Sequence, residues 1–306
     1  MRVLVTGASG CIGHYLSERL IRETAHELFL LVRDPSRLHV DLSSRPGVHV
    51  VTGDLSKRDA FQDILGQAEA LVHVAAVWGG PEAEAINHHA TLELVRRLDP
   101  DACRVVQVFS TASVLARDGT FLSEAESLGT PYIRSKARAA RALPALPLAE
   151  RTTVLYPTLV LGGGGGRPVS HFSNLVREVA RWGWLARFFS ADGSFQWIHA
   201  EDIARVSVDL LEHPPDGPGP HHVVLGGAPV TANAALAALA ESQGRRVHPW
   251  IPVSFPLAEL LIRVFRIQMA AWDRYCMRQR HFIYDGAVTP ADYGLPVFCP
   301  TLREGL

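Results

Sequence analysis

Tyr132 and Lys136 are the residues whose types and spacing most directly suggest chemistry. They lie four residues apart in the segment Tyr-Ile-Arg-Ser-Lys, which places both side chains on one face of a helix. A tyrosine hydroxyl can exchange a proton with a substrate oxygen, but a free phenol titrates at about pH 10. A neighbouring ammonium group favours the phenolate and so lowers that pKa. The pair predicts a proton-transfer site, although the same spacing also arises by chance on surface helices.

Hydroxyl side chains come shortly before this pair, at the end of a predicted buried strand over residues 104–109. Ser110, Thr111 and Ser113 follow that strand. In an open parallel sheet, the ligand crevice lies outside the carboxyl ends of the strands. We therefore expect these hydroxyl groups and the Tyr–Lys pair to meet at one edge of the sheet, with Ser110 packing as a strand residue.

A glycine-rich turn near the N-terminus predicts a nucleotide-binding loop. It has the spacing G-x-x-G-x-x-G and lies between a predicted strand over 3–5 and a predicted helix over 12–22. Gly7 permits the tight turn, Gly10 lets the backbone approach a pyrophosphate, and Gly13 lets the helix pack closely. The helix N-terminus then faces the anion. The predicted cofactor contacts in this loop are Gly7, Ser9, Gly10, Cys11, Ile12 and Gly13.

The end of the second predicted strand, over 28–32, distinguishes NADP from NAD. About 20 residues beyond the glycines, an acidic side chain suits the ribose hydroxyl of NAD, whereas an arginine suits the 2′-phosphate of NADP. Arg33 occupies this place and Arg37 lies near it. Asp34 is a competing signal, but Pro35 is expected to turn the chain just after it. We predict NADP as the cofactor and consider NAD less favoured; the alternative is that both arginines lie on a solvated loop.

Short apolar runs alternate with helical patterns through the first half of the chain. The predicted strands cover residues 3–5, 28–32, 48–51, 70–76, 104–109 and 153–160. They are apolar throughout, which is typical of a parallel sheet buried on both faces. The fold class is therefore α/β: a Rossmann-type doubly wound parallel sheet with a smaller, mostly helical C-terminal substrate region. We place the NADP-binding domain at 1–161, with 195–213 packing back onto it, and the substrate-side region at 162–306.

Composition and charge exclude several classes of protein. The 306 residues carry 30 Lys and Arg against 31 Asp and Glu, a formal charge of −1. Without a basic excess, we expect neither a nucleic-acid partner nor binding to acidic membranes. The four cysteines are far apart and form no zinc-ligand spacing with histidine, which predicts a cytoplasmic protein without disulfides or a metal. No integral membrane segment is expected, because the segment 251–272 has the charges of an amphipathic helix.

Motifs spread over nearly the whole chain carry a family resemblance. They are TGASGCIG (6–13), GDL (53–55), HVAA (73–76), Asn87, FSTASV (109–114), YIRSK (132–136), WIHAEDIA (197–204) and PTLREGL (300–306). Together they resemble the extended short-chain dehydrogenase/reductase superfamily, within it the NAD-dependent epimerase/dehydratase family, and there the dihydroflavonol-reductase-like branch.

The resemblance implies a role for each matching residue. Tyr132 would exchange the proton, Lys136 would also bind the nicotinamide ribose, and Thr111 would polarise the substrate oxygen, with Ser113 in reserve. Asp54 would hold the adenine amino group. The remaining implied cofactor contacts are Leu55, Ala75, Ala76, Tyr156 and Pro157. Tyr156 departs from the family pattern, because the family often has Arg-Pro where this chain has Tyr156-Pro157.

The same resemblance implies structural roles for other residues. Asn87 is expected to fix backbone geometry, and His199 and Asp202 are expected to stabilise the start of a helix. The family also suggests a homodimer formed through helices of the cofactor domain.

Three functions remain open on the sequence. The first is an NADP-dependent oxidoreductase that interconverts a carbonyl and an alcohol. The second is a nucleotide-sugar epimerase or dehydratase with tightly bound NAD. Arg33 argues against this second function, whereas cations for a sugar pyrophosphate would favour it, and the candidates are Arg167, Arg177, Arg181 and Arg187. The third is a non-catalytic NADPH-binding sensor or scaffold, which the retained Tyr–Lys pair disfavours.

Large apolar side chains after residue 161 favour the first function. Small-molecule pockets are mainly apolar with few polar anchors, whereas a sugar nucleotide needs cations and hydrogen-bonding groups. Trp78, just beyond the fourth predicted strand, and Phe172 are the candidate substrate contacts beside Ser113. We therefore expect a medium-sized, largely apolar small-molecule substrate, such as an aromatic, terpenoid or steroid-like carbonyl or alcohol.

Overall fold

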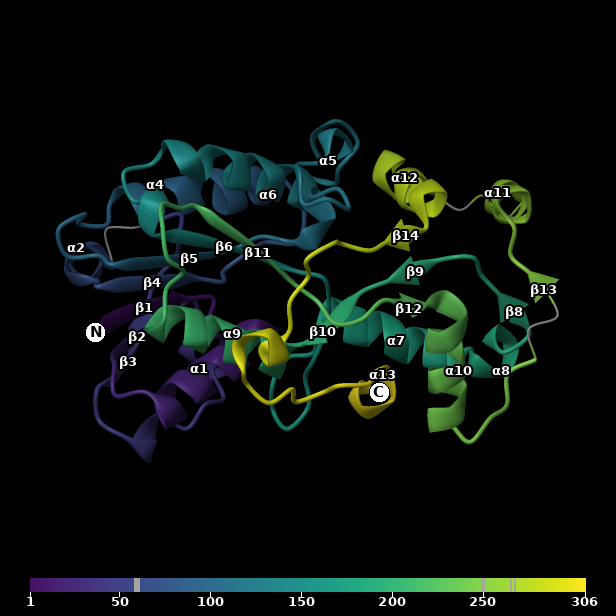
Figure 1. Ribbon diagram of the computed structural model, residues 1–306, viewed down its shortest axis with the longest axis horizontal. Coiled ribbons are helices and arrows are strands. Elements are labelled where there is room, and N and C mark those ends of the chain that lie inside the picture. Colours follow the sequence, from purple (N-terminus) through teal and green to yellow (C-terminus); the bar gives the residue numbers. More distant parts are fainter. Residues whose placement is uncertain (58–60, 249–250, 265, 267) are drawn as a thin grey trace.

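A seven-stranded parallel sheet forms the centre of the molecule (Figure 1). The computed structural model describes residues 1–306 except 58–60, 249–250, 265 and 267. The strand order is β11-β6-β5-β4-β1-β2-β3. The strands are β1 (Arg2–Thr6), β2 (Glu27–Val32), β3 (Val48–Thr52), β4 (Ala70–His73), β5 (Val105–Phe109), β6 (Thr152–Pro157) and β11 (His221–Leu225). Helices cover both faces, so the predicted Rossmann-type α/β fold is confirmed.

Each strand divides its side chains between two cores, one on each face of the sheet. Along β1, Leu4 enters one core, whereas Val3 and Val5 enter the other. The first core lies against α2 (Gln62–Gln67), α4 (Thr91–Arg96) and α6 (Pro131–Ala142), and the second against α1 (Cys11–Glu23) and α9 (Ala200–Glu212). Burial on both faces explains why the strand sequences are apolar throughout.

The sixth predicted strand, 153–160, is in fact two strands. β6 ends at Pro157, and β7 (Leu159–Leu161) leaves the main sheet to pair with β10 (Trp197–His199). The change of sheet occurs at Thr158. The N–H of Thr158 donates to the carbonyl oxygen of Leu225 in β11, whereas the N–H of Leu159 donates to the carbonyl oxygen of Gln196, just before β10. The seventh strand of the sheet, β11, was not predicted. The predicted strand over 70–76 is shorter in the structure, because β4 ends at His73.

Short helices complete the cofactor half of the molecule. Residues 82–96 form one continuous helical segment that includes a π-helical stretch. The short elements are η1 (Pro35–Arg37), η2 (Leu42–Ser44), α3 (Glu82–Glu84), η4 (Ala85–Ala90), η5 (Ala112–Val114), α5 (Ser123–Ser127), η6 (Leu143–Ala145) and η7 (Ala149–Arg151).

The C-terminal region combines helices with three small sheets. Besides β7–β10, β9 (Ser194–Phe195) lies between β12 (Val230–Thr231) and β14 (His281–Phe282), and β13 (Ile251–Pro252) pairs with β8 (Phe189–Ser190). The helices are α7 (His171–Arg181), α8 (Gly183–Ala186), α10 (Ala232–Ser242), α11 (Phe255–Val264), α12 (Ala271–Gln279), η8 (Pro290–Tyr293) and α13 (Leu302–Gly305). Across the described part of the chain, no helix is long and apolar enough to cross a bilayer. The domain boundary at residue 161 stays a prediction.

Candidate active site

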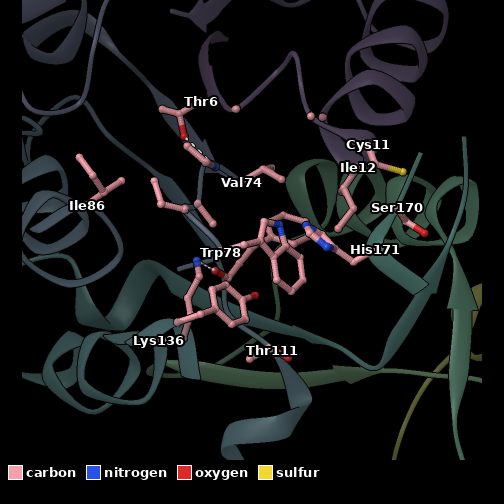
Figure 2. A pocket seen from close by; sticks show the side chains of 18 of the residues that line it. Thr6, Cys11, Ile12, Val74, Trp78, Ile86, Thr111, Lys136, Ser170 and His171 are labelled. Atoms are coloured by element: carbon pink, nitrogen blue, oxygen red, sulfur yellow. Dashed lines mark hydrogen bonds between the residues drawn. The ribbon is translucent and has the colours of Figure 1, made fainter. Parts of the chain in front are cut away.

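A cavity of about 960 Å³ lies along the carboxyl ends of the parallel strands and extends to α7 (Figure 2). Strands β1, β2, β4 and β5 all end at its wall, as expected for an open α/β sheet. The predicted residues that line it are Gly7, Ser9, Gly10, Cys11, Ile12, Gly13, Arg33, Arg37, Asp54, Leu55, Ala75, Ala76, Trp78, Thr111, Ser113, Tyr132, Lys136 and Phe172. Residues scattered over most of the chain therefore meet around one space.

Two predicted cofactor contacts lie elsewhere. Tyr156 is fully buried in the core, and its hydroxyl lies 2.8 Å from Nδ1 of His222. Pro157 is buried at the end of β6, and neither residue lines the cavity. Because strand side chains alternate between the two faces, Tyr156 points into the helix-covered core. Thr158 is the residue of this segment that reaches the cavity.

The glycine loop has the shape of a pyrophosphate cradle. Gly7 has a φ of +75°, and a Cβ on it would lie 2.6 Å from the backbone nitrogen of Ala75. A Cβ on Gly13 would lie 2.0 Å from the carbonyl oxygen of Gly7. Gly10 is the N-cap of α1 and has no side chain to bond the first N–H groups of the helix. These donors and the helix dipole are left for an anion, so the residues present fit a dinucleotide phosphate.

Cys11 adds no redox chemistry to this loop. Burial raises the pKa of its thiol to about 12. The thiol therefore stays protonated at neutral pH, and thiols react chiefly as thiolates. Cys11 is a packing residue at the base of the cavity.

The end of β2 presents two guanidinium groups to the cavity. Arg33 and Arg37 are exposed and line it, whereas Asp34 does not. Oδ1 of Asp34 accepts hydrogen bonds from the backbone N–H of Ser36 (3.0 Å) and from its hydroxyl (2.7 Å), which hold the pKa of Asp34 below its usual range. Asp34 thus caps η1, leaving the arginines as the charged groups at this place.

Asp54 lies at the end of β3, in the same part of the cavity. Its Oδ1 accepts hydrogen bonds from the backbone N–H and the hydroxyl of Ser56, each at 2.8 Å. These bonds, with the nearby Arg33, keep the pKa of Asp54 low. The carboxylate is ionised at neutral pH and can accept a further hydrogen bond.

Tyr132 and Lys136 face the cavity from α6, where the hydroxyl of Thr130 caps the first turn and Pro131 begins the helix. Nζ of Lys136 donates to the carbonyl oxygen of Phe109 at 2.7 Å, and burial lowers its pKa to about 8. Burial raises the pKa of Tyr132 above its usual range. The lowering of the phenol pKa expected from the sequence is therefore outweighed by desolvation. The Tyr132 phenol is protonated at neutral pH.

Three hydroxyl groups behind Tyr132 have different partners. Ser113 lies near enough to the Tyr284 hydroxyl to lower the pKa of that phenol, although burial raises this pKa overall. Among the described residues, the one bond to Oγ1 of Thr111 is a long one of 3.4 Å from the backbone N–H of Ser113. The hydroxyl hydrogen of Thr111 is therefore available to a ligand. Ser110 also lines the cavity, and its buried Oγ has no hydrogen-bond partner among the residues that the structure describes. The expectation that Ser110 is only a packing residue does not account for this.

Aromatic rings stack across the cavity next to Tyr132. The Trp78 indole lies 4.4 Å from the Tyr132 ring at an interplanar angle of 18°, and 3.9 Å from the His171 ring at 44°. Figure 2 shows Trp78 and His171 together in the cavity. Trp78 remains 56% exposed, so part of its surface can contact a ligand although two rings pack against it.

Buried hydrogen bonds hold the backbone that carries Trp78. Oδ1 of Asn87 accepts from the N–H of Val77, and Nδ2 of Asn87 donates to the carbonyl of Val77, both at 2.8 Å. Nδ2 also contacts the hydroxyl of Ser135 on α6 at 3.1 Å. Asn87 therefore fixes backbone geometry, as the sequence predicted.

His199 caps a helix as the sequence predicted, whereas Asp202 holds the C-terminal segment instead of the helix start. Nδ1 of His199 accepts from the N–H of Glu201 and caps α9. The carboxylate of Asp202 accepts from the backbone N–H groups of Phe298 and Cys299. Neither residue lines the cavity.

Sequence reasoning missed several residues that line the substrate end of the cavity, among them Ser170 and His171, and it did not single out Trp272 as a substrate contact. Ser170 caps α7 through its hydroxyl, and His171 is the first residue of that helix. A serine directly before a predicted helix is a signal for this N-terminus, and it could have placed His171 beside the sheet edge. No local pattern marks Trp272, which arrives from α12.

The four arginines considered for a sugar pyrophosphate do not line this cavity. Arg167 forms a two-point contact with Glu18, with Nη2 2.6 Å from Oε2 and Nε 3.0 Å from Oε1, and it lies over the Tyr15 ring. Arg187 lies over the ring of Phe188. At the substrate end, the residues from Thr158 to Leu175 that line the cavity include no Lys or Arg.

Comparison with known proteins decides the family. A model of the NAD dependent epimerase/dehydratase family matches residues 3–226. The chain belongs to that family. Most of the residues that the family model matches belong to the central sheet, its covering helices and the cavity wall that they form. No curated protein matches the chain, and the dihydroflavonol-reductase-like branch stays a prediction.

Solved structures share the fold at low sequence identity. Gox2253 is 23% identical, with 93% of this chain and 89% of that chain covered and a TM-score of 0.68. The dTDP-glucose 4,6-dehydratase (rfbB) from Bacillus anthracis, in complex with NAD, is 15% identical, with 100% and 94% covered and a TM-score of 0.69. The UDP-glucose 4-epimerase from Bifidobacterium longum, in complex with NAD+ and UDP, is 16% identical, with 99% and 95% covered and a TM-score of 0.69. These likenesses concern the fold.

Proposed function

We propose that this epimerase/dehydratase family member is an NADP-dependent oxidoreductase that interconverts a carbonyl and an alcohol on a medium-sized, largely apolar substrate. The observation that carries the proposal is the combination of Tyr132 and Lys136 at one end of the cavity with Arg33 and Arg37 at the other. Such a cavity suits an extended dinucleotide with a 2′-phosphate.

Tyr132 is the proposed proton donor. Bound nicotinamide supplies or accepts the hydride at the substrate carbon. Because burial keeps the Tyr132 phenol protonated, it suits donation to a carbonyl oxygen, the direction of reduction. The Thr111 hydroxyl, free of a strong partner, donates a second hydrogen bond to that oxygen. Lys136 keeps two further N–H groups beyond its bond to Phe109, and these suit the ribose hydroxyls.

The cofactor assignment depends on the end of β2. A guanidinium group is a strong partner for phosphate, because it forms charge-assisted hydrogen bonds. Arg33 and Arg37 both line this end of the cavity, and Asp34 is engaged in its own turn. The loop thus offers cations rather than an acceptor for ribose hydroxyls, which favours NADPH over NADH. Gly7, Gly10 and Gly13 would cradle the pyrophosphate, and Asp54 would accept the adenine amino group.

The substrate class follows from the lining at the nicotinamide end. Trp78, Phe172, Leu175 and Trp272 present apolar surface there. The polar side chains there are mostly uncharged hydroxyl groups, and His171 is the basic side chain that the C-terminal region contributes to the lining. A flat apolar body would pack against the exposed part of Trp78 while its carbonyl faced Tyr132, and this arrangement matches the usual composition of small-molecule pockets.

A nucleotide-sugar epimerase or dehydratase with tightly bound NAD is the second candidate. It is favoured by family membership and by structural neighbours such as the Bifidobacterium longum epimerase in complex with NAD+ and UDP. The lack of Lys or Arg among the lining residues from Thr158 to Leu175 weighs against it, because a pyrophosphate needs cations. A non-catalytic NADPH-binding role would leave Tyr132 and Lys136 unexplained.

One experiment separates these functions. The purified protein is denatured and any released nucleotide is identified, and the protein is then assayed with NADPH on apolar ketones and aldehydes beside UDP- and dTDP-sugars. The proposal predicts a site that takes up added NADPH and turnover of apolar carbonyls. Retained NAD with turnover of sugar nucleotides alone would reverse the ranking, and NADPH binding without any turnover would favour the non-catalytic role.

A further inference from the structure

Large apolar side chains are exposed on α8, β13 and α11 and at Trp182 just before α8. Figure 1 shows these elements at the end of the molecule opposite the N-terminal strand. Trp182 is 63% exposed, Trp184 54%, Leu260 55% and Val264 63%. Leu185 and Ile251 are exposed beside them. We call these six residues, with the exposed Arg181, Arg246, Arg263 and Arg266, the distal surface.

Backbone hydrogen bonds join the segment before α11 to the residues that follow α8. The N–H of His248 donates to the carbonyl of Arg187 at 2.8 Å, and the N–H of Ile251 donates to that of Phe188 at 3.0 Å. These bonds place the segment before α11 alongside the end of α8. β13, which leads directly into α11, therefore lies beside β8, which follows α8.

The distal surface also lies in the basic part of an electrically divided chain. Residues 171–190 and 243–280 together contain ten Arg and three Asp or Glu, a net charge of +7. The whole chain has a formal charge of −1, so the remaining residues carry −8. The expectation of no binding to acidic membranes was based on the near-neutral total charge of the chain. That total does not show how the charges are distributed along the chain.

Tryptophan, aliphatic and arginine side chains are the groups that bind the interface of an anionic bilayer. Tryptophan favours the headgroup level of a bilayer, aliphatic side chains enter the acyl boundary, and basic residues are attracted to anionic lipid. A protein surrounded only by water rarely exposes such a cluster without a partner. We propose that the distal surface binds the surface of an anionic lipid bilayer, peripherally and without spanning it.

The position of the cavity agrees with this partner. Leu175 lines the cavity and is exposed, and it lies seven residues before Trp182, on the same side of α7. The exposed face of α7 therefore leads from the cavity to the distal surface. Docking on a bilayer would bring the cavity close to lipid-dissolved molecules. The membrane contact itself does not depend on which reaction the cavity carries out.

The test is co-sedimentation of the full-length protein with vesicles of phosphatidylcholine alone and of phosphatidylcholine with phosphatidylglycerol. We expect binding to the anionic vesicles only, weakened by added salt. Two variants remove the two components: Arg246→Glu with Arg263→Glu, and Trp182→Ser with Trp184→Ser. Each basic residue at an anionic surface contributes several-fold to binding, so the charge variant should lose at least about tenfold in partitioning, and the tryptophan variant should also bind less.

A matched control reverses two exposed arginines outside the distal surface, Arg96→Glu with Arg104→Glu. It has the same net charge as the arginine variant of the distal surface and should bind like the wild type. Thermal melting verifies that each variant folds, and Leu260→Ser with Val264→Ser replaces the tryptophan variant if that one unfolds. No binding of the wild type to anionic vesicles, or equal loss in the control, would overturn the proposal. So would sedimentation showing self-association that depends on Trp182 and Trp184 but no vesicle binding, because the surface would then join copies of this chain.

Discussion

Replacement of Arg33 by alanine should weaken NADPH binding and leave NADH binding unchanged. Arg33 directly follows β2 and lines the cavity with Arg37, and its guanidinium is the group placed to meet a 2′-phosphate. NADH lacks that phosphate. The substitution therefore removes an interaction that only one of the two cofactors makes.

The size of the effect follows from the exposure of the side chain. Loss of a hydrogen bond to a charged group costs about 1.5–3 kcal/mol. Arg33 is exposed, solvent weakens such contacts, and Arg37 remains to bind the phosphate. We therefore expect the lower end, about 1.5 kcal/mol, which is roughly a tenfold increase in the Kd of NADPH.

Fluorescence titration of NADPH and NADH measures both affinities in the wild type, in Arg33→Ala and in a control, Arg96→Ala. Arg96 is an exposed arginine on α4 that does not line the cavity, so its loss should change neither affinity. Added salt should weaken the binding of NADPH more than that of NADH. The reasoning is refuted if the wild type prefers NADH, or if Arg33→Ala weakens both cofactors equally.

Three further predictions concern the pH dependence, the substrate and the stability. Because the pKa of Lys136 is lowered to about 8, its charge is lost as the pH rises through that value, so cofactor affinity and kcat should fall there. Lys136→Ala should lower both quantities and remove their fall near pH 8. An unchanged fall in this variant would assign the pH dependence to another group. Trp78→Ala should raise KM for flat aromatic ketones about three- to tenfold, from the loss of an aromatic contact, without changing the Kd of NADPH. Equal effects on aliphatic ketones would contradict an aromatic contact. His73 is fully buried and its pKa is lowered from 6.5 to about 3. Its contribution to the free energy of unfolding is therefore complete above pH 6.5 and is lost as the pH falls toward 3. Denaturant unfolding should show this fall in the free energy of unfolding for the wild type and for an exposed-site control, His213→Asn, and a smaller fall for His73→Asn. Parallel curves of unfolding free energy against pH for all three proteins would rule out His73 as the source.

The cofactor half of the site could be predicted because its signals are local. The glycines of the loop act within one turn, and the close backbone packing at Gly7 and Gly13 follows from a strand running directly into a helix. The Tyr132–Lys136 pair needs only the helix period. Unbroken apolar runs indicate buried parallel strands, which is why the sheet was predicted apart from its edge strand β11.

The substrate half could not be predicted in the same way because it depends on contacts between distant segments. Trp78 meets His171 across more than ninety positions of sequence, and no local pattern specifies that meeting. The direction of the Tyr156 side chain was misjudged because a strand residue before a turn can face either the core or the crevice. The segment that leads into α11 meets the segment that follows α8 only when β13 pairs with β8.

The most direct test of the central claim compares the wild type with Tyr132→Phe in the reduction of apolar ketones and aldehydes by NADPH. The substitution removes one oxygen atom, so melting temperature and NADPH affinity should be retained. Loss of a general acid should lower kcat by about a hundredfold or more. Wild-type turnover that collapses in Tyr132→Phe is the predicted result. Undiminished turnover in this variant, with NADPH binding intact, would contradict the account.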